Sequence, residues 1–202
     1  MKALALPLAL LLGAAAFALN KGNAGPTDVQ LKFDLPAPAP LSPEEALKSF
    51  KLPPGFRIEL VASEPMIEAP VAISFDEQGR LFVVEMRGYM RDMEGTTEKD
   101  PLGRIALLTD TDGDGRMDKS SAFLDNLVMP RGVMAVKGGA FVAEPPNLFF
   151  CRDTKGTGKA DEKIIVASDF GTFGGQPEHM ANTPTWAMDN RVYAAGYATS
   201  FT

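Results

Sequence analysis

The sequence predicts an all-β fold made of short strands joined by tight turns. From about residue 52 onward, runs rich in valine, isoleucine, leucine and phenylalanine alternate with glycine, aspartate and proline, a pattern typical of a sandwich, barrel or propeller. A repeat selects among these, because the Asp-Thr-x-Gly-x-Gly turn at Asp110 recurs at Asp153, 43 residues later. Self-similarity at about 40–50 residues, with about four strands per unit, is typical of propeller blades. We therefore predict a partial β-propeller of about three to four blades, preceded by a short helix.

The first residues have the features of a secretory signal peptide. Lys2 precedes an apolar run over residues 3–17, and a small-x-small cleavage site lies at residues 16–18. The alternative is a membrane anchor, but the run contains Pro7 and is shorter than the ~20 residues of a spanning helix. We therefore expect a signal peptide over residues 1–18, a periplasmic or secreted protein, and no stable membrane span after cleavage.

A proline-rich linker and a helix lead into the predicted propeller domain. Residues 19–41 include "LPAPAPLSP", a stiff composition without apolar periodicity. Ser42 then provides an N-cap, with Pro43 at the first helical position and Glu45 completing a capping box. These signals predict a helix over residues 43–50, at the start of a domain spanning residues 42–202.

Hairpins account for most of the predicted strands. Three stretches read as strand, tight turn, strand: residues 71–85, 132–144 and 184–196. Further strands precede and follow each copy of the repeated turn. The expected strands are 56–62, 71–75, 80–86, 104–110, 121–124, 133–138, 140–145, 148–153, 163–168, one beginning near Trp186, and 191–196.

The first copy of the repeated turn carries a candidate calcium site. Its candidate ligands are Asp110, Asp112, Asp114, the Arg116 carbonyl and Asp118. In the second copy, Lys155 and Thr157 replace Asp112 and Asp114 while the glycines remain, so the shared role is a hairpin turn. Ser121 stands where a helix-loop-helix calcium site has its bidentate glutamate, and no flanking helices are expected. For the first copy, both a structural turn and an occupied Ca²⁺ site remain open.

Composition excludes several classes of partner and cofactor. The net charge of −6 and the lack of basic runs argue against nucleic-acid binding. The single cysteine, Cys151, allows no intrachain disulfide, and the absence of a CxxCH motif excludes covalently attached c-type haem in this chain. Closed propellers use about 4–8 blades, so we expect either a fragment of a longer protein or a partner that covers its edge. We accordingly expect no turnover from this chain alone.

The only histidine, His179, is the candidate general base. It follows a flexible "GTFGG" loop and precedes the strand expected near Trp186, where propellers face their central channel. With Glu178 and Asn182 close in sequence, its imidazole is suited to accept a proton from a hydroxyl group. The alternative is a surface or capping histidine without a catalytic role.

Five motifs in order resemble a known family. They are "PPGFRIELVASEPMIEAPVAISFDEQGRLFVVEMRGY", "DTDGDGRMD", "MPRGVMAV", "EPPNLFFCRDTKGTGKADE" and "PEHMANTPTWAMDNRVYAA". Together they resemble the membrane-bound dehydrogenase propeller proteins of planctomycete-type bacteria. These proteins are similar to sorbosone and soluble glucose dehydrogenases, which use pyrroloquinoline quinone (PQQ). The resemblance covers residues from about Leu52 to the end.

The resemblance implies a quinone-dependent sugar or alcohol dehydrogenase. His179 would act as the general base on the sugar hydroxyl, and a c-type cytochrome is an implied electron acceptor. The implied cofactor-binding residues are Arg87, Arg131, Glu85, Glu144 and Asn182, with arginine suited to grip carboxylates through bidentate pairs. Three features depart from the family. Asn182-Thr183-Pro184 replaces its usual Asn-Gly-Leu, and the later blades that would supply further cofactor ligands are absent. The cytochrome c module that many relatives carry is also absent from this chain. The alternative function is a non-catalytic propeller that binds carbohydrate or protein.

Overall fold

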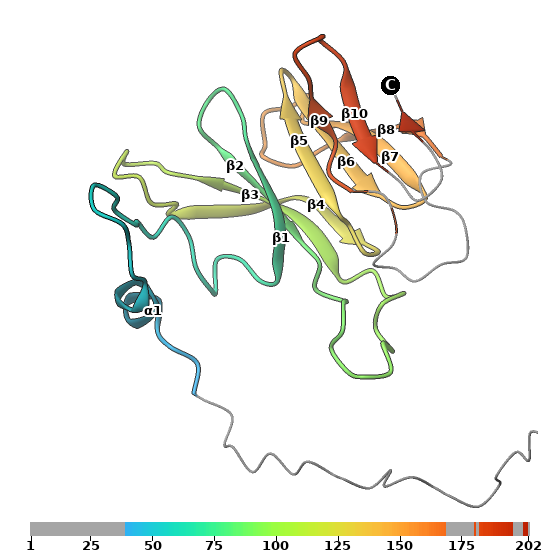
Figure 1. The fold of residues 1–202 in the computed structure, drawn as a ribbon. Helices are drawn as coiled ribbons and strands as arrows, with labels where there is room; N and C mark the ends of the chain where they lie inside the picture. The colour runs from blue at the N-terminus through green and yellow to red at the C-terminus, as the bar shows by residue number, and fades with distance from the viewer. Residues whose placement is uncertain (1–38, 169–179, 181, 196–199, 202) are drawn as a thin grey trace, which may run out of the picture. The chain divides into compact units, whose positions relative to one another are not determined.

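Antiparallel β-sheet makes up almost all of the regular structure, as the sequence predicts. The computed structural model describes residues 39–168, 180, 182–195 and 200–201 (Figure 1). Its single helix is α1 (Pro43–Ser49). The strands are β1 (Pro70–Phe75), β2 (Leu81–Glu85), β3 (Gly103–Thr109), β4 (Lys119–Leu127), β5 (Gly132–Val136), β6 (Gly139–Glu144), β7 (Asn147–Arg152), β8 (Glu162–Ala167), β9 (Thr185–Trp186), β10 (Val192–Ala195) and β11 (Ser200–Phe201).

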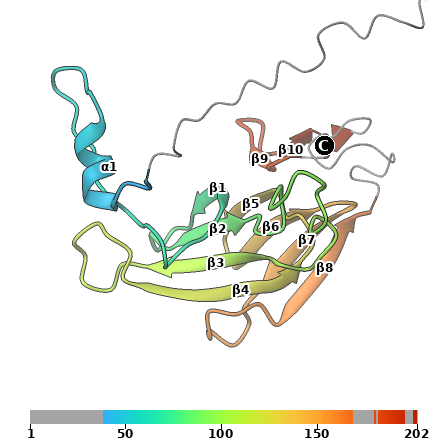
Figure 2. The ribbon, with the colours of Figure 1, turned by 90° about the horizontal axis from the view of Figure 1, so that it is seen from below.

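The strands form propeller blades in which each strand pairs with its neighbour in sequence. Blade 1 has the order β1-β2-β3-β4 and blade 2 the order β5-β6-β7-β8, while sheet 3 contains β9, β10 and β11 in the order β11-β10-β9. Figures 1 and 2 show the two blades side by side, with β9 and β10 next to blade 2. The chain therefore has an all-β, propeller-type fold with a short N-terminal helix.

The main hydrophobic core lies between blades 1 and 2. Alternate residues of each strand point to the same face of a sheet, and both facing surfaces here are apolar. Blade 1 contributes Phe82, Val84, Ile105, Leu107, Phe123, Leu124 and Leu127; blade 2 contributes Val133, Ala140, Val142, Phe149 and Cys151. The Phe82 and Phe123 rings meet edge to face with centroids 5.0 Å apart, an arrangement favoured by the ring quadrupole.

The opposite faces of the two blades also carry apolar residues. On blade 1 these are Leu81, Val83, Ala106, Leu108 and Met117, against which Ala62, Met66 and Ile67 pack. On blade 2, Ala143 and Leu148 pack with Ala194 of β10. Blade 2 therefore has a neighbouring sheet on each face, blade 1 on one and sheet 3 on the other.

The helix begins as its capping signals predict. The Ser42 hydroxyl accepts the Glu45 N–H at 3.2 Å, and the Glu45 carboxylate accepts the Ser42 N–H at 2.9 Å. The helix ends at Ser49, one residue earlier than expected, because Phe50 is extended. Over the described part of the chain, no helix combines the length and apolarity needed to cross a membrane.

The prediction of a strand over residues 56–62 is wrong. Residues 56–62 have no strand pairing among the described residues, although each of the other expected strands overlaps an observed one. The side chains from Arg57 to Ala62 nevertheless alternate between exposed and half-buried, as they do along a strand. Its sequence has strand propensity, but a strand forms only where a partner supplies the ladder of hydrogen bonds.

Candidate functional site

The predicted cofactor-binding residues gather at one end of the blades. We call this the entry end, because β1 and β5 both begin there. Glu85, the last residue of β2, pairs with Pro70 at the start of β1. Glu144 likewise ends β6, and Arg131 directly precedes β5. Sheet register therefore brings Glu85, Arg87, Arg131 and Glu144 to the same end.

Asn182 approaches this end through its neighbour. Thr183 lies so close to Gly132, the first residue of β5, that an added Cβ on the glycine would be 2.5 Å from the Thr183 Cα. Only glycine permits this approach. The Asn182 side chain itself is exposed.

Glu85 is the centre of a charged cluster. Its carboxylate is fully buried and accepts bonds from Arg87 Nη2 at 2.6 Å and Arg104 Nε at 2.6 Å. Glu68 donates its backbone N–H to Glu85 Oε1 at 3.2 Å. The Glu68 carboxylate pairs with Arg87 at 3.5 Å and Arg91 at 3.3 Å. Three guanidinium groups thus face two carboxylates, which leaves one surplus positive charge in the cluster.

Glu144 holds the corresponding position in blade 2. Its carboxylate accepts the Val128 backbone N–H at 2.8 Å and the Lys163 ammonium at 2.8 Å. Like Glu85, it ends the second strand of its blade and binds a backbone N–H of the segment that enters that blade. Both glutamates therefore have a structural function, and their contact with a cofactor stays a prediction.

Of the two remaining candidates, the structure describes Arg131 but not His179. Arg131 is buried, and its backbone N–H bonds to the Ala143 carbonyl at 2.8 Å. His179 lies outside the described residues, so its position at the central channel stays a prediction.

Sequence reasoning missed Arg104 and Glu68. Arg104 is the β3 residue that pairs with Glu85, and cross-strand neighbours of opposite charge are favourable. Its position at the start of the predicted strand 104–110, opposite a glutamate that ends the preceding strand, was the available signal. Glu68 lies in an irregular segment, and no local pattern indicated its contact with the arginines.

The two repeated turns lie at the opposite end, which we call the turn end. In the first turn, Asp110 accepts the N–H groups of Gly113 at 2.7 Å and Gly115 at 2.9 Å. Asp118 accepts the Thr111 N–H at 2.9 Å. The bonds from Gly115 and then Gly113 lower the pKa of Asp110.

The second turn repeats this arrangement. Asp153 accepts the Gly158 N–H at 2.6 Å, and Asp161 accepts the Thr154 N–H at 2.8 Å. The Thr154 backbone bond is the largest cause that lowers the pKa of Asp161 to about 2. One turn joins β3 to β4 and the other joins β7 to β8. Their predicted equivalence is confirmed.

The two turns differ in their charge. In the first, carboxylate oxygens of Asp110, Asp112 and Asp118 all lie within 4.8 Å of one another, whereas Asp114 Oδ1 accepts the Arg116 N–H at 2.8 Å. In the second, the Lys155 ammonium lies 3.2 Å from Asp161. Oxygen ligands suit Ca²⁺, so three predicted ligands have compatible positions, and calcium binding stays a prediction.

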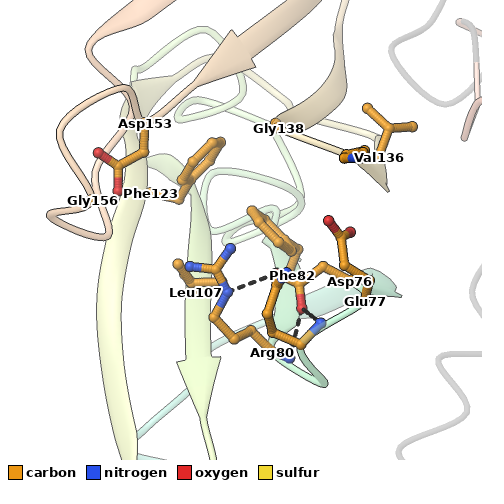
Figure 3. Close-up of a pocket in the computed structure, with 13 residues that line it drawn as sticks. Asp76, Glu77, Arg80, Phe82, Leu107, Phe123, Val136, Gly138, Asp153 and Gly156 are labelled. Carbon is orange, nitrogen blue, oxygen red and sulfur yellow. Dashed lines mark hydrogen bonds and ion pairs between the residues drawn. The ribbon is translucent and has the colours of Figure 1, made fainter.

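A pocket of about 410 Å³ also opens at the turn end, between the blades (Figure 3). The Phe82 and Phe123 rings lie in its wall, and Arg80 is held to Asp76 at 2.7 Å. Asp153 of the second turn also lines it. None of the predicted cofactor residues that the structure describes contributes to its wall.

Residues 42–201 match the model of a protein family described as Domain of unknown function (DUF7133). A search of curated proteins found no match. Among solved structures, the chain is similar to a provisionally assigned oxidoreductase (glucose dehydrogenase) from Thermus thermophilus. The identity is 17% and the TM-score 0.47, with 70% of this chain and 41% of that chain covered. The chain thus spans less than half of that protein.

Proposed function

The chain belongs to the family described as Domain of unknown function (DUF7133), and we propose that it is an exported, dehydrogenase-like propeller that binds an anionic quinone of PQQ type. Its substrate would be a sugar or an alcohol. The observation that carries the proposal is the gathering of Arg87, Arg104 and Arg131 at the entry end of two adjacent blades. The motif resemblance supplies the identity of the cofactor.

The charge of the entry end suits a ligand that carries carboxylates. The cluster around Glu85 has one surplus positive charge. Each guanidinium also carries more N–H donors than the carboxylates beside it accept. Arg87 and Arg104 would hold carboxylates from blade 1, and Arg131 would do so from blade 2. A bound quinone would supply carbonyl groups that accept electrons.

His179 would take the proton from the substrate hydroxyl. A neutral imidazole is suited to accept this proton. The electrons would pass on to an external acceptor, for which a c-type cytochrome is the class implied by the resemblance. Export would follow from the predicted signal peptide, and N-terminal sequencing of the mature protein tests the cleavage after residue 18.

Calorimetric titration with PQQ tests the cofactor assignment. We expect Arg87→Gln to weaken binding by about tenfold or more, because it removes a charge-assisted hydrogen-bond donor. Arg80→Gln is the matched control, since Arg80 pairs with an acidic neighbour, Asp76, at the opposite end. Circular dichroism checks that both variants fold. Equal PQQ affinity in the two variants would contradict the proposal.

The alternative is a non-catalytic binding module. It is favoured by one observation: Glu85 and Glu144 both bind backbone N–H groups, which a scaffold requires without any cofactor. Dye reduction by the complete propeller rather than by this chain alone, with added quinone and a panel of sugars, separates the two functions. The enzyme requires reduction that His179→Ala abolishes, whereas the binding module requires carbohydrate or protein binding without reduction.

A further inference from the structure

The two carboxylates of the charged cluster at the entry end differ in how firmly they hold its arginines. Glu85 is fully buried, and its carboxylate lies 2.6 Å from both Arg87 Nη2 and Arg104 Nε. The Glu68 side chain is 45% exposed, and its oxygens lie 3.5 Å from Arg87 and 3.3 Å from Arg91. Short charge-assisted bonds are strong, whereas longer ion pairs at exposed positions contribute little to stability. Glu68 is therefore the partner that an incoming anion can replace.

The backbone that carries Glu68 is fixed on both sides, so only its side chain would have to move. The Glu68 N–H bonds to Glu85 Oε1 at 3.2 Å, and the Ala69 carbonyl accepts the Met86 N–H at 3.1 Å. Before Glu68, the Met66 side chain packs against the face of blade 1 that points away from blade 2. The half-exposed carboxylate can therefore turn into solvent while its segment keeps its place.

Arg91 belongs to the same cluster, although it lies outside the strands. Its side chain is 51% exposed and stands in the loop between β2 and β3. The Gly88 carbonyl accepts the Thr97 hydroxyl at 2.8 Å, and this bond joins the two sides of the loop around Arg91. Arg91 and Arg87 thus flank a single carboxylate, with one guanidinium at each oxygen of Glu68. A ligand carboxylate can be bound between them in the same way.

We propose that Glu68 is a displaceable counter-ion of the quinone site and that Arg91 is a further ligand-binding residue there, an inference that rests on the proposed function. In the ligand-free protein the Glu68 carboxylate neutralises two guanidinium groups that would otherwise repel each other. A ligand carboxylate takes its place between Arg87 and Arg91, and Glu68 turns into solvent. Three guanidinium groups then face the single carboxylate of Glu85, so the surplus positive charge rises from one to two. This favours ligands that carry more than one carboxylate.

Calorimetric titration of this chain with PQQ and, separately, with trimesate, an aromatic tricarboxylate without a quinone, tests the displacement. We expect Glu68→Gln to bind each anion at least about fivefold more tightly than the native chain does, because no ion pair has to be broken first. Glu94→Gln is the matched control, since it removes an exposed charge from the neighbouring loop and forms none of the ion pairs of the cluster. Unchanged or weaker binding by Glu68→Gln, or an equal gain in Glu94→Gln, would overturn the proposal.

The contribution of Arg91 is measured in the Glu68→Gln background, where no carboxylate competes for it. There we expect Arg91→Gln to weaken binding of both anions at least about fivefold, because it removes a charge-assisted donor. With Glu68 in place the same substitution should cost less, because it removes the ion pair of Glu68 together with that of the ligand. Lys99→Gln is the matched control, since Lys99 is an exposed cation of the same loop. Equal effects of Arg91→Gln and Lys99→Gln would exclude Arg91 from the site.

The two anions separate the failure of this proposal from the failure of the proposed function. Trimesate binding that tightens in Glu68→Gln, while PQQ binds neither form, would support the counter-ion and contradict the quinone. PQQ binding that Glu68→Gln leaves unchanged would retain the quinone and overturn the counter-ion. If neither anion bound to Glu68→Gln, both proposals would be wrong. Circular dichroism checks that each variant is folded.

Discussion

Single residues at the entry end show how a buried charge is accommodated. Glu85 is fully buried, yet two guanidinium groups and one backbone N–H satisfy its carboxylate. Burying a charge is costly unless it is paired and hydrogen-bonded. The Glu144 carboxylate has a similar arrangement with fewer donors, namely one ammonium and one backbone N–H. The two glutamates thus hold equivalent positions in their blades, but the buried charge of Glu85 needs more partners than that of Glu144.

This inequality predicts different effects on stability. Glu85→Ala leaves two arginines without their shared buried partner, so we expect a loss of about 3–5 kcal/mol in the free energy of unfolding. Glu144→Ala should cost less, because Lys163 can turn to solvent. Urea denaturation measures both, with the exposed Glu94→Ala as control. A loss at Glu85 no larger than at Glu94 would contradict the assigned network.

Elements of the fold differ in how well local sequence predicts them. The helix and both repeated turns were predictable, because a capping box and positive-φ glycines act within a few residues. Residues 56–62 were mispredicted as paired, because propensity does not say whether a partner strand exists. Burial on both faces sets the register of the strands within each blade. The local sequence alone does not give that register, so the pairing of Arg104 with Glu85 was not inferred.

The two turns are expected to differ in calcium binding. Three carboxylates converge in the first turn, whereas Lys155 supplies a positive charge beside Asp161 in the second. Calorimetric titration with CaCl₂ should show binding that Asp112→Ala abolishes and Asp153→Ala leaves intact, because hard cations require oxygen ligands. Equal loss of affinity in both variants would assign the effect to turn folding rather than to coordination.

At the scale of the whole molecule, the blades position one candidate site at each end. Pattern and repeat predicted the blades, and the strand-end location of Glu85 and Arg87 followed from them. What sequence did not reveal is which charges meet: Glu68 reaches the arginines from an irregular segment 17 residues before Glu85. Contacts of that kind depend on how the chain packs, which no local motif encodes.

Cys151 reports on the integrity of the interface between blades. It is fully buried in the core that both blades share, and burial raises its pKa to about 12. We expect iodoacetamide to label it only when the blades separate, at a rate that follows the fraction unfolded in urea. Because the folded pKa exceeds the ordinary value of 9.0, its contribution to stability is complete below pH 9 and declines between about pH 9 and 12.

Rapid labelling of Cys151 in the native protein at neutral pH would contradict its burial. A Cys151→Ser variant controls for modification elsewhere in the chain and should incorporate no label.

The pairing of every strand with its neighbour in sequence has a consequence for folding kinetics. Most hairpins close a short loop, the exception being residues 86–102 between β2 and β3. The contact order within a blade is therefore low, and little chain entropy is lost before the first contacts form. Blade 1 uses only residues that precede blade 2 in the sequence. During synthesis it can therefore assemble while the later strands are still in the ribosome, and blade 2 then folds against a surface that already exists.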